Sequence, residues 1–446
     1  MRKQSILFFL LISLSLWSQK KPIVLDMESA IAYGLENNPA IQNANLEIRK
    51  AYKERWATIA IGLPQISLSG SYQNFLELPV SLVPAQFFGG AEGEFAELQF
   101  GTTQNMIGSV QVSQLLFNGS YLVGLKASKV FLTISELGLE KTNLEVRKAI
   151  IDAYGTVLLA RENVSILKKN KANLERTLEE TQKIVANGFA EEENAEQLQL
   201  TLSRLDSQLN YATNLKEITT AMLKWVLGMP ESDSLQLNQS LEELAALKMM
   251  ENKSTPPFTI DNNVDLKFAE NEKESEWLLY QNEKAKSMPV LSAFINGTYT
   301  GNSNDFTFTE TNQKWFGSSL FGINLQIPVF SSFLRAAKTQ KAKLAVEQAE
   351  TRLSDTRNRL VLELQMAENE MTLALKNYLT TKEDLALAER IEQKNKLKFL
   401  EGMSSSFDLR QAQQQLYTTQ SQYLQSMKAV IDARTTLETI SNTPIQ

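Results

Sequence analysis

The sequence repeats one pattern twice, and this duplication constrains the fold more than any other feature. Four short motifs recur at nearly constant spacing. The first two pairs share one offset along the chain: Asn37-Asn38-Pro39-Ala40-Ile41 with Asn262-Asn263-Val264-Asp265-Leu266, and Leu63-Pro64-Gln65-Ile66 with Met288-Pro289-Val290-Leu291. The other two pairs share a shorter offset: Phe117-Asn118-Gly119 with Phe330-Ser331-Ser332, and Ala186-Asn187-Gly188 with Leu400-Glu401-Gly402. An insertion in the first copy, between Tyr72 and Phe117, explains the change of offset. We therefore expect two copies of one structural unit.

Each copy opens with a helical pattern that stops at a proline. The first helix is expected to begin near Leu25 and the second near Asp265. Both are expected to stop at Pro64 or Pro289, because proline disfavours helix in the residue before it.

Apolar and polar residues alternate directly after each proline, which is the pattern of a strand with two different faces. The apolar positions include Ile66, Leu68, Tyr72, Leu291, Ile295 and Tyr299, and the polar positions between them include Ser67, Ser69, Ser71, Ser292, Asn296 and Thr298. Alternation returns after polar, glycine-containing loops, at Val110 and Val112 and again at Phe321, Ile323 and Leu325. The sequence predicts β-hairpins over 65–117 and 290–330, whose loops, roughly 74–105 and 300–317, form exposed tips.

Long proline-free helical sequence follows each hairpin, from about Tyr121 to Asn187 and from about Phe333 to Glu401. At about 1.5 Å per residue, each helix would span roughly 100 Å. Gly188 and Gly402 interrupt these runs, and a second helix follows each of them. We expect long helical hairpins over 120–228 and 333–441, with each glycine acting as a helix C-cap.

Composition argues against an enzyme. The chain has no cysteine and no histidine, which removes soft metal ligands, the common nucleophile pairs and the proton shuttle of neutral pH. No glycine-rich phosphate loop is present, and a net charge of -6 without a long basic run disfavours nucleic acid as a partner. We expect no catalytic residues, no cofactor and no resident metal.

The N-terminus resembles a secretory signal. Arg2 and Lys3 precede a mainly apolar stretch from Ile6 to Trp17, and cleavage is expected near Ser18, so that 1–18 is removed. The alternative is an N-terminal membrane anchor. No later stretch is apolar for long enough to make a membrane helix, so a mature chain that crosses a membrane must cross it as strands.

Strands that are apolar on one face suit a barrel wall in lipid, although a soluble sandwich is the alternative. Four strands cannot close such a barrel, because open edges are not tolerated in lipid. Two chains would supply eight strands and three would supply twelve. A barrel of eight strands is filled by side chains, so a conduit favours three chains.

The order of these features resembles the TolC-like outer-membrane factors, also called outer membrane efflux proteins. The residues that carry the resemblance are the signal sequence, Asn37-Asn38-Pro39, Leu63-Pro64-Gln65, Gln114-Leu115-Leu116-Phe117-Asn118-Gly119, the hairpin glycines and Leu227-Gly228. The resemblance covers essentially the whole mature chain. It implies a mixed α and β membrane protein, namely a homotrimer with a 12-stranded β-barrel in the outer membrane of a Gram-negative bacterium, continued by a 12-helix periplasmic tunnel. The first repeat would be 19–228 and the second 265–446, with 229–264 as the equatorial linker between them.

The resemblance also implies partners and contact sites. The tips Gly188-Phe189-Ala190 and Gly402-Met403-Ser404 match the places where family members touch a periplasmic adaptor, the membrane fusion protein. Glu191-Glu192-Glu193 are either acids placed favourably at a helix N-terminus or charges at the tunnel entrance. Some relatives have an acidic ring before the second tip, whereas this chain has Lys394, Lys396 and Lys398 there, which argues against a cation-binding constriction.

The function expected from these features is passive. The chain would be the exit duct for small molecules in a tripartite efflux system, driven through the adaptor by an inner-membrane RND or ABC transporter. One alternative is the same duct serving type I protein secretion. An alternative of another class is a periplasmic structural coiled-coil protein without a pore, which would be soluble without detergent.

Overall fold

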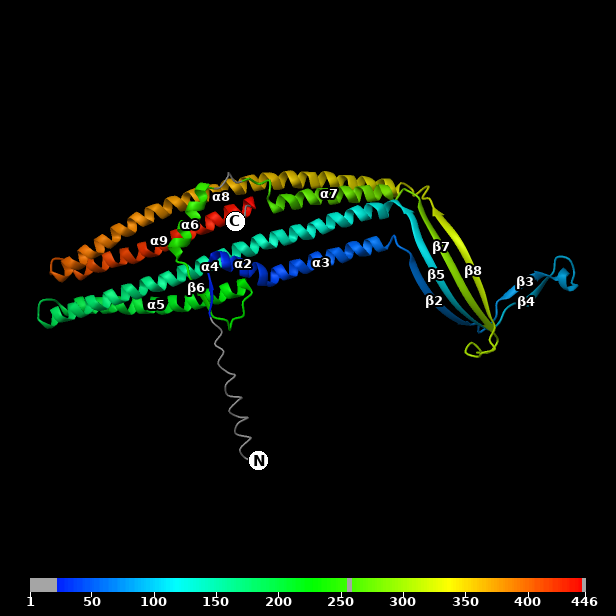
Figure 1. Ribbon diagram of the computed structural model, residues 1–446, viewed down its shortest axis with the longest axis horizontal. Helices are drawn as coiled ribbons and strands as arrows, with labels where there is room; N and C mark the ends of the chain where they lie inside the picture. Colours follow the sequence, from blue (N-terminus) through cyan, green and yellow to red (C-terminus); the bar gives the residue numbers. More distant parts are fainter. Residues whose placement is uncertain (1–21, 255–258, 443–446) are drawn as a thin grey trace, which may run out of the picture. The chain divides into compact units, whose positions relative to one another are not determined.

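A computed structural model describes residues 22–254 and 259–442 (Figure 1). The predicted signal sequence, 1–18, therefore lies outside the described residues. The chain divides into two compact units. The helical unit comprises the residues before 49 together with 134–270 and 352–446, and the sheet unit comprises 49–133 and 271–351. Each unit takes segments from both copies of the repeat, so the copies are interleaved rather than arranged as separate domains.

The sheet unit contains a four-stranded antiparallel sheet. Its strands are β2 (Gln65–Asn74), β5 (Gln104–Asn118), β7 (Val290–Ser303) and β8 (Trp315–Gln326), in the spatial order β2-β5-β7-β8. Strands β2 and β5 form the hairpin of the first copy, and β7 and β8 form the hairpin of the second. Pairing of β5 with β7 joins the two copies into one sheet.

The register gives this sheet one apolar and one polar face, because side chains alternate along a strand and paired residues share a face. Ile66, Val112, Ile295 and Phe321 form one row across all four strands. A polar row runs through Ser69, Ser109, Thr298 and Ser318, in which the hydroxyls of Ser69 and Ser109 are 2.7 Å apart. The alternation predicted from the sequence is confirmed.

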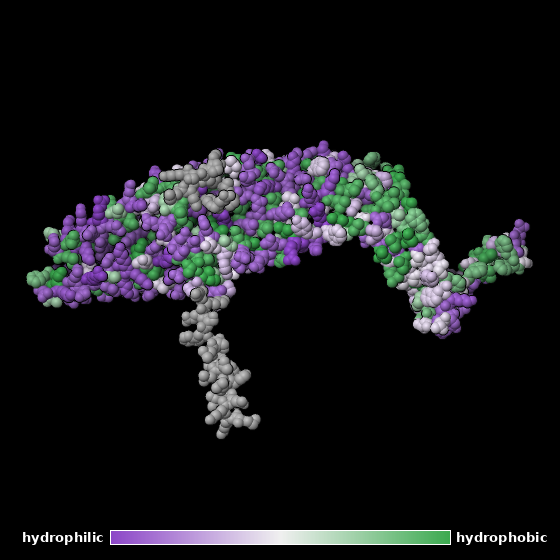
Figure 2. Space-filling model, in the orientation of Figure 1, coloured by the Kyte–Doolittle hydropathy of each residue, from purple (hydrophilic) through white to green (hydrophobic). Residues whose placement is uncertain are grey.

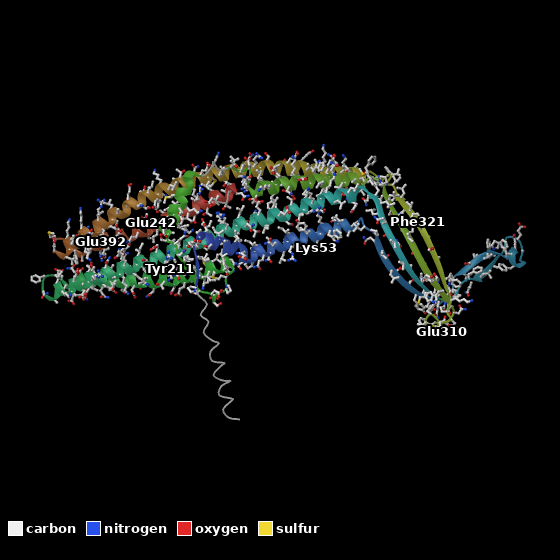
Figure 3. The ribbon with its side chains drawn as sticks, in the orientation of Figure 1. Lys53, Tyr211, Glu242, Glu310, Phe321 and Glu392 are labelled. Atoms are coloured by element: carbon white, nitrogen blue, oxygen red, sulfur yellow. The ribbon has the colours of Figure 1, made fainter. Side chains whose placement is uncertain are left out.

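The apolar face of the sheet is exposed to solvent. Ile66 is 74% exposed and Leu68 is 79% exposed, and Phe321 lies on the same face (Figure 3). Figure 2 shows hydrophobic residues gathered over the strands. A soluble sandwich would bury such a face against a second sheet, so this surface argues against the sandwich alternative.

The loop expected over 74–105 is not a simple loop. It contains a second small hairpin, β3 (Val80–Pro84) paired antiparallel with β4 (Phe95–Gln99), with the short 3-10 helix η1 (Ala85–Phe88) between them. Val80, Leu82 and Val83 favour strand, and Gly89, with φ at 78°, ends η1 in a left-handed turn. The glycines of this segment favour a loop in the sequence and mask the short strand pair. The hairpin accounts for the insertion in the first copy.

The expected first helix is in fact two helices, α2 (Met27–Asn37) and α3 (Pro39–Ala60). The chain breaks at Asn38, whose ψ of 129° is extended, because the ring of Pro39 excludes helical geometry from the residue before it. The second copy has valine in place of this proline, and its helix α7 (Val264–Ala285) begins at that equivalent position, just as α3 begins at Pro39. Both α3 and α7 end before the prolines that were expected to stop them.

The long helices occur once in each copy and have nearly equal lengths. Helix α4 (Gly119–Ala186) has 68 residues and α8 (Leu334–Leu400) has 67. Each is followed by a helix of 36 residues, α5 (Glu192–Leu227) and α9 (Ser406–Ser441). Among the residues that the structure describes, no helix is both long and apolar enough to cross a membrane.

The core of the helical unit is built from both copies. It includes Ile150 and Tyr154 of α4, Leu227 of α5, and Val430 and Ile431 of α9, which are fully or almost fully buried. The region expected to be a linker is also ordered. β6 (Leu235–Leu237) pairs in parallel with β1 (Ile23–Leu25), and α6 (Leu241–Ser254) packs on α9. The linker is therefore part of the core rather than a connection outside it.

A buried ion cluster ties α6 to α9. Arg434 is fully buried, and its Nε lies 3.0 Å from Oε1 of Glu438. Lys248 of α6, also buried, reaches the same oxygen at 3.3 Å. Because a charge taken out of water needs an opposite charge close by, these groups fix the position of α6 against α9.

Candidate functional site

The two turns that end the helical hairpins have the same geometry. Gly188 and Gly402 adopt φ of 77° and 74°, in the left-handed region that glycine enters without strain. The following amides point back into the preceding helix: N–H of Phe189 donates to the carbonyl of Ile184 at 3.1 Å, and N–H of Met403 donates to that of Lys398 at 2.8 Å. This is a Schellman C-cap, and the predicted capping role of both glycines is confirmed.

The residue after each glycine is a large apolar side chain that lies exposed. Phe189 is 84% exposed and Met403 is 66% exposed. In many Schellman caps this position packs against the last turn of its own helix, whereas here both side chains are mostly exposed. Ala190 and Ser404, the next residues of the expected contact segments, are half-buried. Each tip therefore presents one uncovered apolar side chain.

The helices that leave the two tips begin differently. Helix α5 starts with Glu191 at the N-cap, whose side chain makes no capping hydrogen bond, and Glu192 and Glu193 occupy its first turn. All three are exposed, and Glu193 accepts a hydrogen bond from Gln197 at 2.8 Å. Glu192 and Glu193 therefore have the favourable placement of acids at a helix N-terminus. A further role at an entrance stays a prediction.

Helix α9 begins with a full capping box, which the sequence reading missed. Oγ of Ser405 accepts from the amide of Asp408, and the Asp408 carboxylate accepts from the amide of Ser405 at 3.1 Å. Hydrogen bonds from the Ser405 side chain and backbone hold the pKa of Asp408 below its usual range. The signal was present as a Ser-x-x-Asp spacing. Ser404 also donates to Asp408, which fixes the tip to this helix start.

A small apolar cluster brings the two tips to the same end of the helical unit (Figure 1). It takes its buried members from all four long helices: Leu174, Leu178, Leu198, Leu205, Phe399 and Leu409. Ser406 lies 3.4 Å from the side-chain oxygen of Gln197, across α9 and α5. The structure therefore places together the two segments chosen from the sequence, although they belong to different copies of the repeat.

The basic segment before the second tip faces outward in part. Lys394 and Lys398 are exposed, and Lys396 is half-buried. Glu392, on the same helix (Figure 3), has its pKa raised by burial, with an opposing effect from Lys396. The expectation that this segment does not form an acidic ring stays a prediction.

Two grooves beside α9 were not predicted: the larger lies chiefly between α8 and α9, and the smaller is lined by α4, α5 and α9. Their volumes are about 810 and 690 Å³, and both are lined by Gln414, Thr418 and Gln422 of α9. Tyr211 of α5 lines the smaller groove (Figure 3). Amide and hydroxyl side chains dominate the lining from α9. The sequence signal for these grooves is the glutamine-rich run of 411–425 at helical spacing.

The sheet is open at both edges. Strands β2 and β8 each have a single neighbour among the described strands, so that one side of each carries unpaired backbone groups. Within the described part of the chain, no group of three or more acidic, cysteine or histidine residues could hold a metal ion.

Comparison with known proteins identifies a family and a set of similar structures. The family model of the outer membrane efflux proteins matches residues 31–229 and 258–443. No curated protein matches the chain. Solved structures with the same fold are known.

The structure of CusC is 17% identical with a TM-score of 0.70, and the match covers 96% of this chain and 95% of that chain. VceC from Vibrio cholerae, an outer membrane protein, is 14% identical with a TM-score of 0.69, over 93% of this chain and 95% of that chain. The CmeC outer membrane channel of Campylobacter jejuni is 16% identical with a TM-score of 0.70, over 93% and 85%. At such low identity these likenesses establish the fold. Because the family model spans both copies of the repeat, the chain belongs to the outer membrane efflux protein family.

Proposed function

We propose that three copies of this chain form the outer-membrane channel of a tripartite efflux system. The channel is a passive exit duct for small molecules, and an inner-membrane RND or ABC transporter drives them through a periplasmic adaptor. As a member of the outer membrane efflux family, the chain is a protein of the Gram-negative outer membrane. Its sheet lies in the lipid, and its long helices extend into the periplasm.

The observation that carries the proposal is the four-stranded sheet with an exposed apolar face and two open edges. An apolar face of this kind is stable against lipid, whereas unpaired backbone at β2 and β8 is not. Three copies supply twelve strands and remove every edge. A closed barrel of about twelve strands is wider than the filled barrel of eight strands and leaves room for a lumen.

The long helices are consistent with the same number of chains. Each chain contributes α4, α5, α8 and α9, so three chains contribute twelve long helices to one tunnel. The polar row through Ser69, Ser109, Thr298 and Ser318 would line the barrel interior, and lipid would cover the opposite face. The sequence carries no glycine-rich phosphate loop, and in the proposed system the inner-membrane pump supplies the energy.

Extraction and mass measurement test the channel. The mature protein is extracted from outer membranes with detergent, its mass is determined by native mass spectrometry, and its conductance is recorded in a planar lipid bilayer. A three-chain particle that forms discrete conducting steps is expected. A protein that is soluble without detergent, or a monomer that does not conduct, would overturn the proposal.

The tips are the proposed contact with the adaptor. Phe189 and Met403 follow equivalent glycines and leave apolar surface uncovered at the same end of the unit. A photo-crosslinking amino acid placed at Phe189 in living cells is expected to capture a periplasmic protein of the size of an adaptor. Met366, which is 63% exposed on the shaft of α8, is the control position. If Phe189 and Met366 capture the periplasmic protein equally well, the tips are not the specific contact with the adaptor.

A further inference from the structure

The two longest helices carry the same stripe of three side chains near their start. Each stripe has a leucine followed by two lysines at the fourth and seventh positions after it, a spacing that puts all three on one face of a helix. The members are Leu122, Lys126 and Lys129 of α4, and Leu334, Lys338 and Lys341 of α8. The four lysines are named here the lysine collar. Counted from the matched Phe117 and Phe330, the positions of the two stripes differ by one residue, so both copies of the repeat carry the stripe.

Both stripes are exposed along their whole length. Leu122 is 49% exposed and Leu334 is 56% exposed, and the lysines of the collar are exposed as well. Within the part of the chain that the structure describes, no carboxylate pairs with a collar lysine. The first acidic residue of α4 is Glu136 and that of α8 is Glu347, beyond the stripe in each case. The collar therefore presents four positive charges that this chain does not neutralise.

The collar lies beside one end of the four-stranded sheet. Helices α3 and α7 lead into β2 and β7, while α4 and α8 follow β5 and β8, and antiparallel pairing brings these four strand ends together (Figure 1). The hydroxyl of Tyr121 donates to the carbonyl of Ile59 at 3.1 Å, which joins α4 to α3 at this end. At about 1.5 Å per residue, the first lysine of each stripe lies about 6 Å beyond its leucine. Each leucine is thus nearer to the sheet than the lysines that follow it.

Helix direction aims the collar at the sheet. The Cα–Cβ bonds of a helix tilt toward its N-terminus, and α4 and α8 both begin at the sheet. Lys53 of α3 is also exposed (Figure 3), but α3 ends at the sheet, so that its side chain tilts the other way. A lysine stem can lie along apolar surface while its ammonium group reaches a polar layer. The collar lysines can therefore place their charges just outside the exposed leucines.

The opposite end of the sheet has the opposite charge. The loops over 75–103 and 304–314 contain six acidic residues and one lysine, all of them exposed. At the helix end, residues 119–135 and 334–346 contain six basic residues and no acidic one. An anionic surface is attracted to the helix end and repelled by the loop end.

We propose that the lysine collar binds the phosphate groups of anionic phospholipids in the periplasmic leaflet of the outer membrane. The proposal rests on the proposed channel, in which the sheet lies in lipid and the helices extend into the periplasm. Leu122 and Leu334 contact acyl chains at the boundary of the hydrocarbon, and the ammonium groups lie in the headgroup layer, which is about 5–7 Å deep on each side of a bilayer. Basic residues directly outside a membrane-embedded segment attract anionic lipids more strongly than zwitterionic ones.

Lipid selection in nanodiscs tests the proposal. The mature protein is placed in nanodiscs of zwitterionic phosphatidylcholine with a minor fraction of anionic phosphatidylglycerol, and native mass spectrometry identifies the lipids that stay bound after release. The collar variant combines Lys126→Gln, Lys129→Gln, Lys338→Gln and Lys341→Gln. A matched control removes four exposed lysines from the same two helices, farther from the sheet: Lys168→Gln, Lys169→Gln, Lys376→Gln and Lys394→Gln.

The unmodified protein and the control are expected to retain phosphatidylglycerol at roughly five times its fraction in the nanodisc, because one lysine near an anionic surface contributes about that factor. The collar variant is expected to retain it near that fraction. Equal enrichment in the collar variant and the control, in particles that still have the mass of a trimer, would overturn the lipid site and leave the channel intact. A mass other than that of a trimer would instead refute the proposed channel.

Two further results would assign the charges differently. Enrichment that both variants lose equally would show that lysines anywhere on the two helices suffice, which contradicts a site at the collar. Co-sedimentation with purified peptidoglycan provides the other comparison. If the collar variant alone loses that binding and its lipid selection is unchanged, the collar contacts the cell wall and the proposal is wrong.

Discussion

At the scale of single residues, Gly228 shows how tightly the two ends of the first repeat approach one another. It ends α5 with φ at 70°, and a Cβ atom there would lie 2.4 Å from the carbonyl oxygen of Asn37. Gly188 has a φ of 77°, but a Cβ there would meet no atom within 4 Å. The two glycines thus share the backbone requirement and differ only in their surroundings.

This difference predicts unequal costs for the same substitution. Gly188→Ala is expected to destabilise the protein by about 1 kcal/mol, which is the cost of placing a side chain in the left-handed region. Gly228→Ala adds a clash with backbone that cannot rotate away, and should cost at least about 2 kcal/mol. Urea unfolding in detergent, followed by circular dichroism, measures both. Equal unfolding midpoints for the two variants would show that the carbonyl of Asn37 does not clash with a Cβ atom at position 228.

At the scale of elements, the sheet separates neighbouring residues into different environments. Leu68 lies on the apolar face and is 79% exposed, and Ser69, next to it, hydrogen-bonds to Ser109 on the polar face. In the proposed channel, Leu68→Arg places a charge in lipid, which costs about 2–4 kcal/mol near the middle of a bilayer. Ser69→Arg would place the same charge on the opposite face, which lines the water-filled interior of that channel. We expect Leu68→Arg to reduce the amount of trimer in outer membranes, and Ser69→Arg to leave it near the level of the unmodified protein. Similar losses in both variants would contradict the assignment of the faces.

At the scale of the whole molecule, the two copies of the repeat are linked by charge across their helices. Nζ of Lys428 on α9 lies 2.5 Å from Asp152 on α4 and 2.5 Å from Asp432 on its own helix. Lys428 is largely buried, whereas the two carboxylates are partly exposed. Lys428→Met should therefore destabilise the protein by about 1–2 kcal/mol, less than the loss of one partner from a fully buried pair. Lys183→Met, which breaks an exposed pair with Glu179, is the control and should change little.

The effect of Lys428→Met also depends on pH. Burial raises the pKa of Asp432, and the hydrogen bond from Lys428 opposes that rise. Without Lys428 the pKa rises further, so the folded chain binds this proton more tightly than the unfolded chain does. Stability then falls as pH rises through that pKa. The destabilisation should be small near pH 4 and larger near pH 7, and unfolding midpoints at the two pH values measure it. A loss that does not change with pH would show that Asp432 is not the titrating group.

The sequence by itself determined the features that depend on near neighbours. Alternation of apolar and polar residues in 65–74 and 315–326 predicted the two faces of the strands, because the side-chain period of a strand is a local property. Gly188 and Gly402 predicted the turns, because a left-handed helix cap is also a local property. The local reading failed where two local signals competed. Helix α2 ends before Pro39, although the helical spacing of apolar residues continues past it. The glycines after η1 favour a loop, although the strands β3 and β4 lie on either side of that segment.

Only the tertiary structure decided which distant segments meet. Pairing of β5 with β7 joins the two copies, α6 packs on α9, and Arg434 is fully buried beside Glu438. None of these follows from spacing along the chain, because strand order depends on contacts between segments far apart in sequence. A buried arginine is stable only when its partner is brought to it by folding. Local periodicity therefore determined what each element is, and long-range packing determined where each element lies.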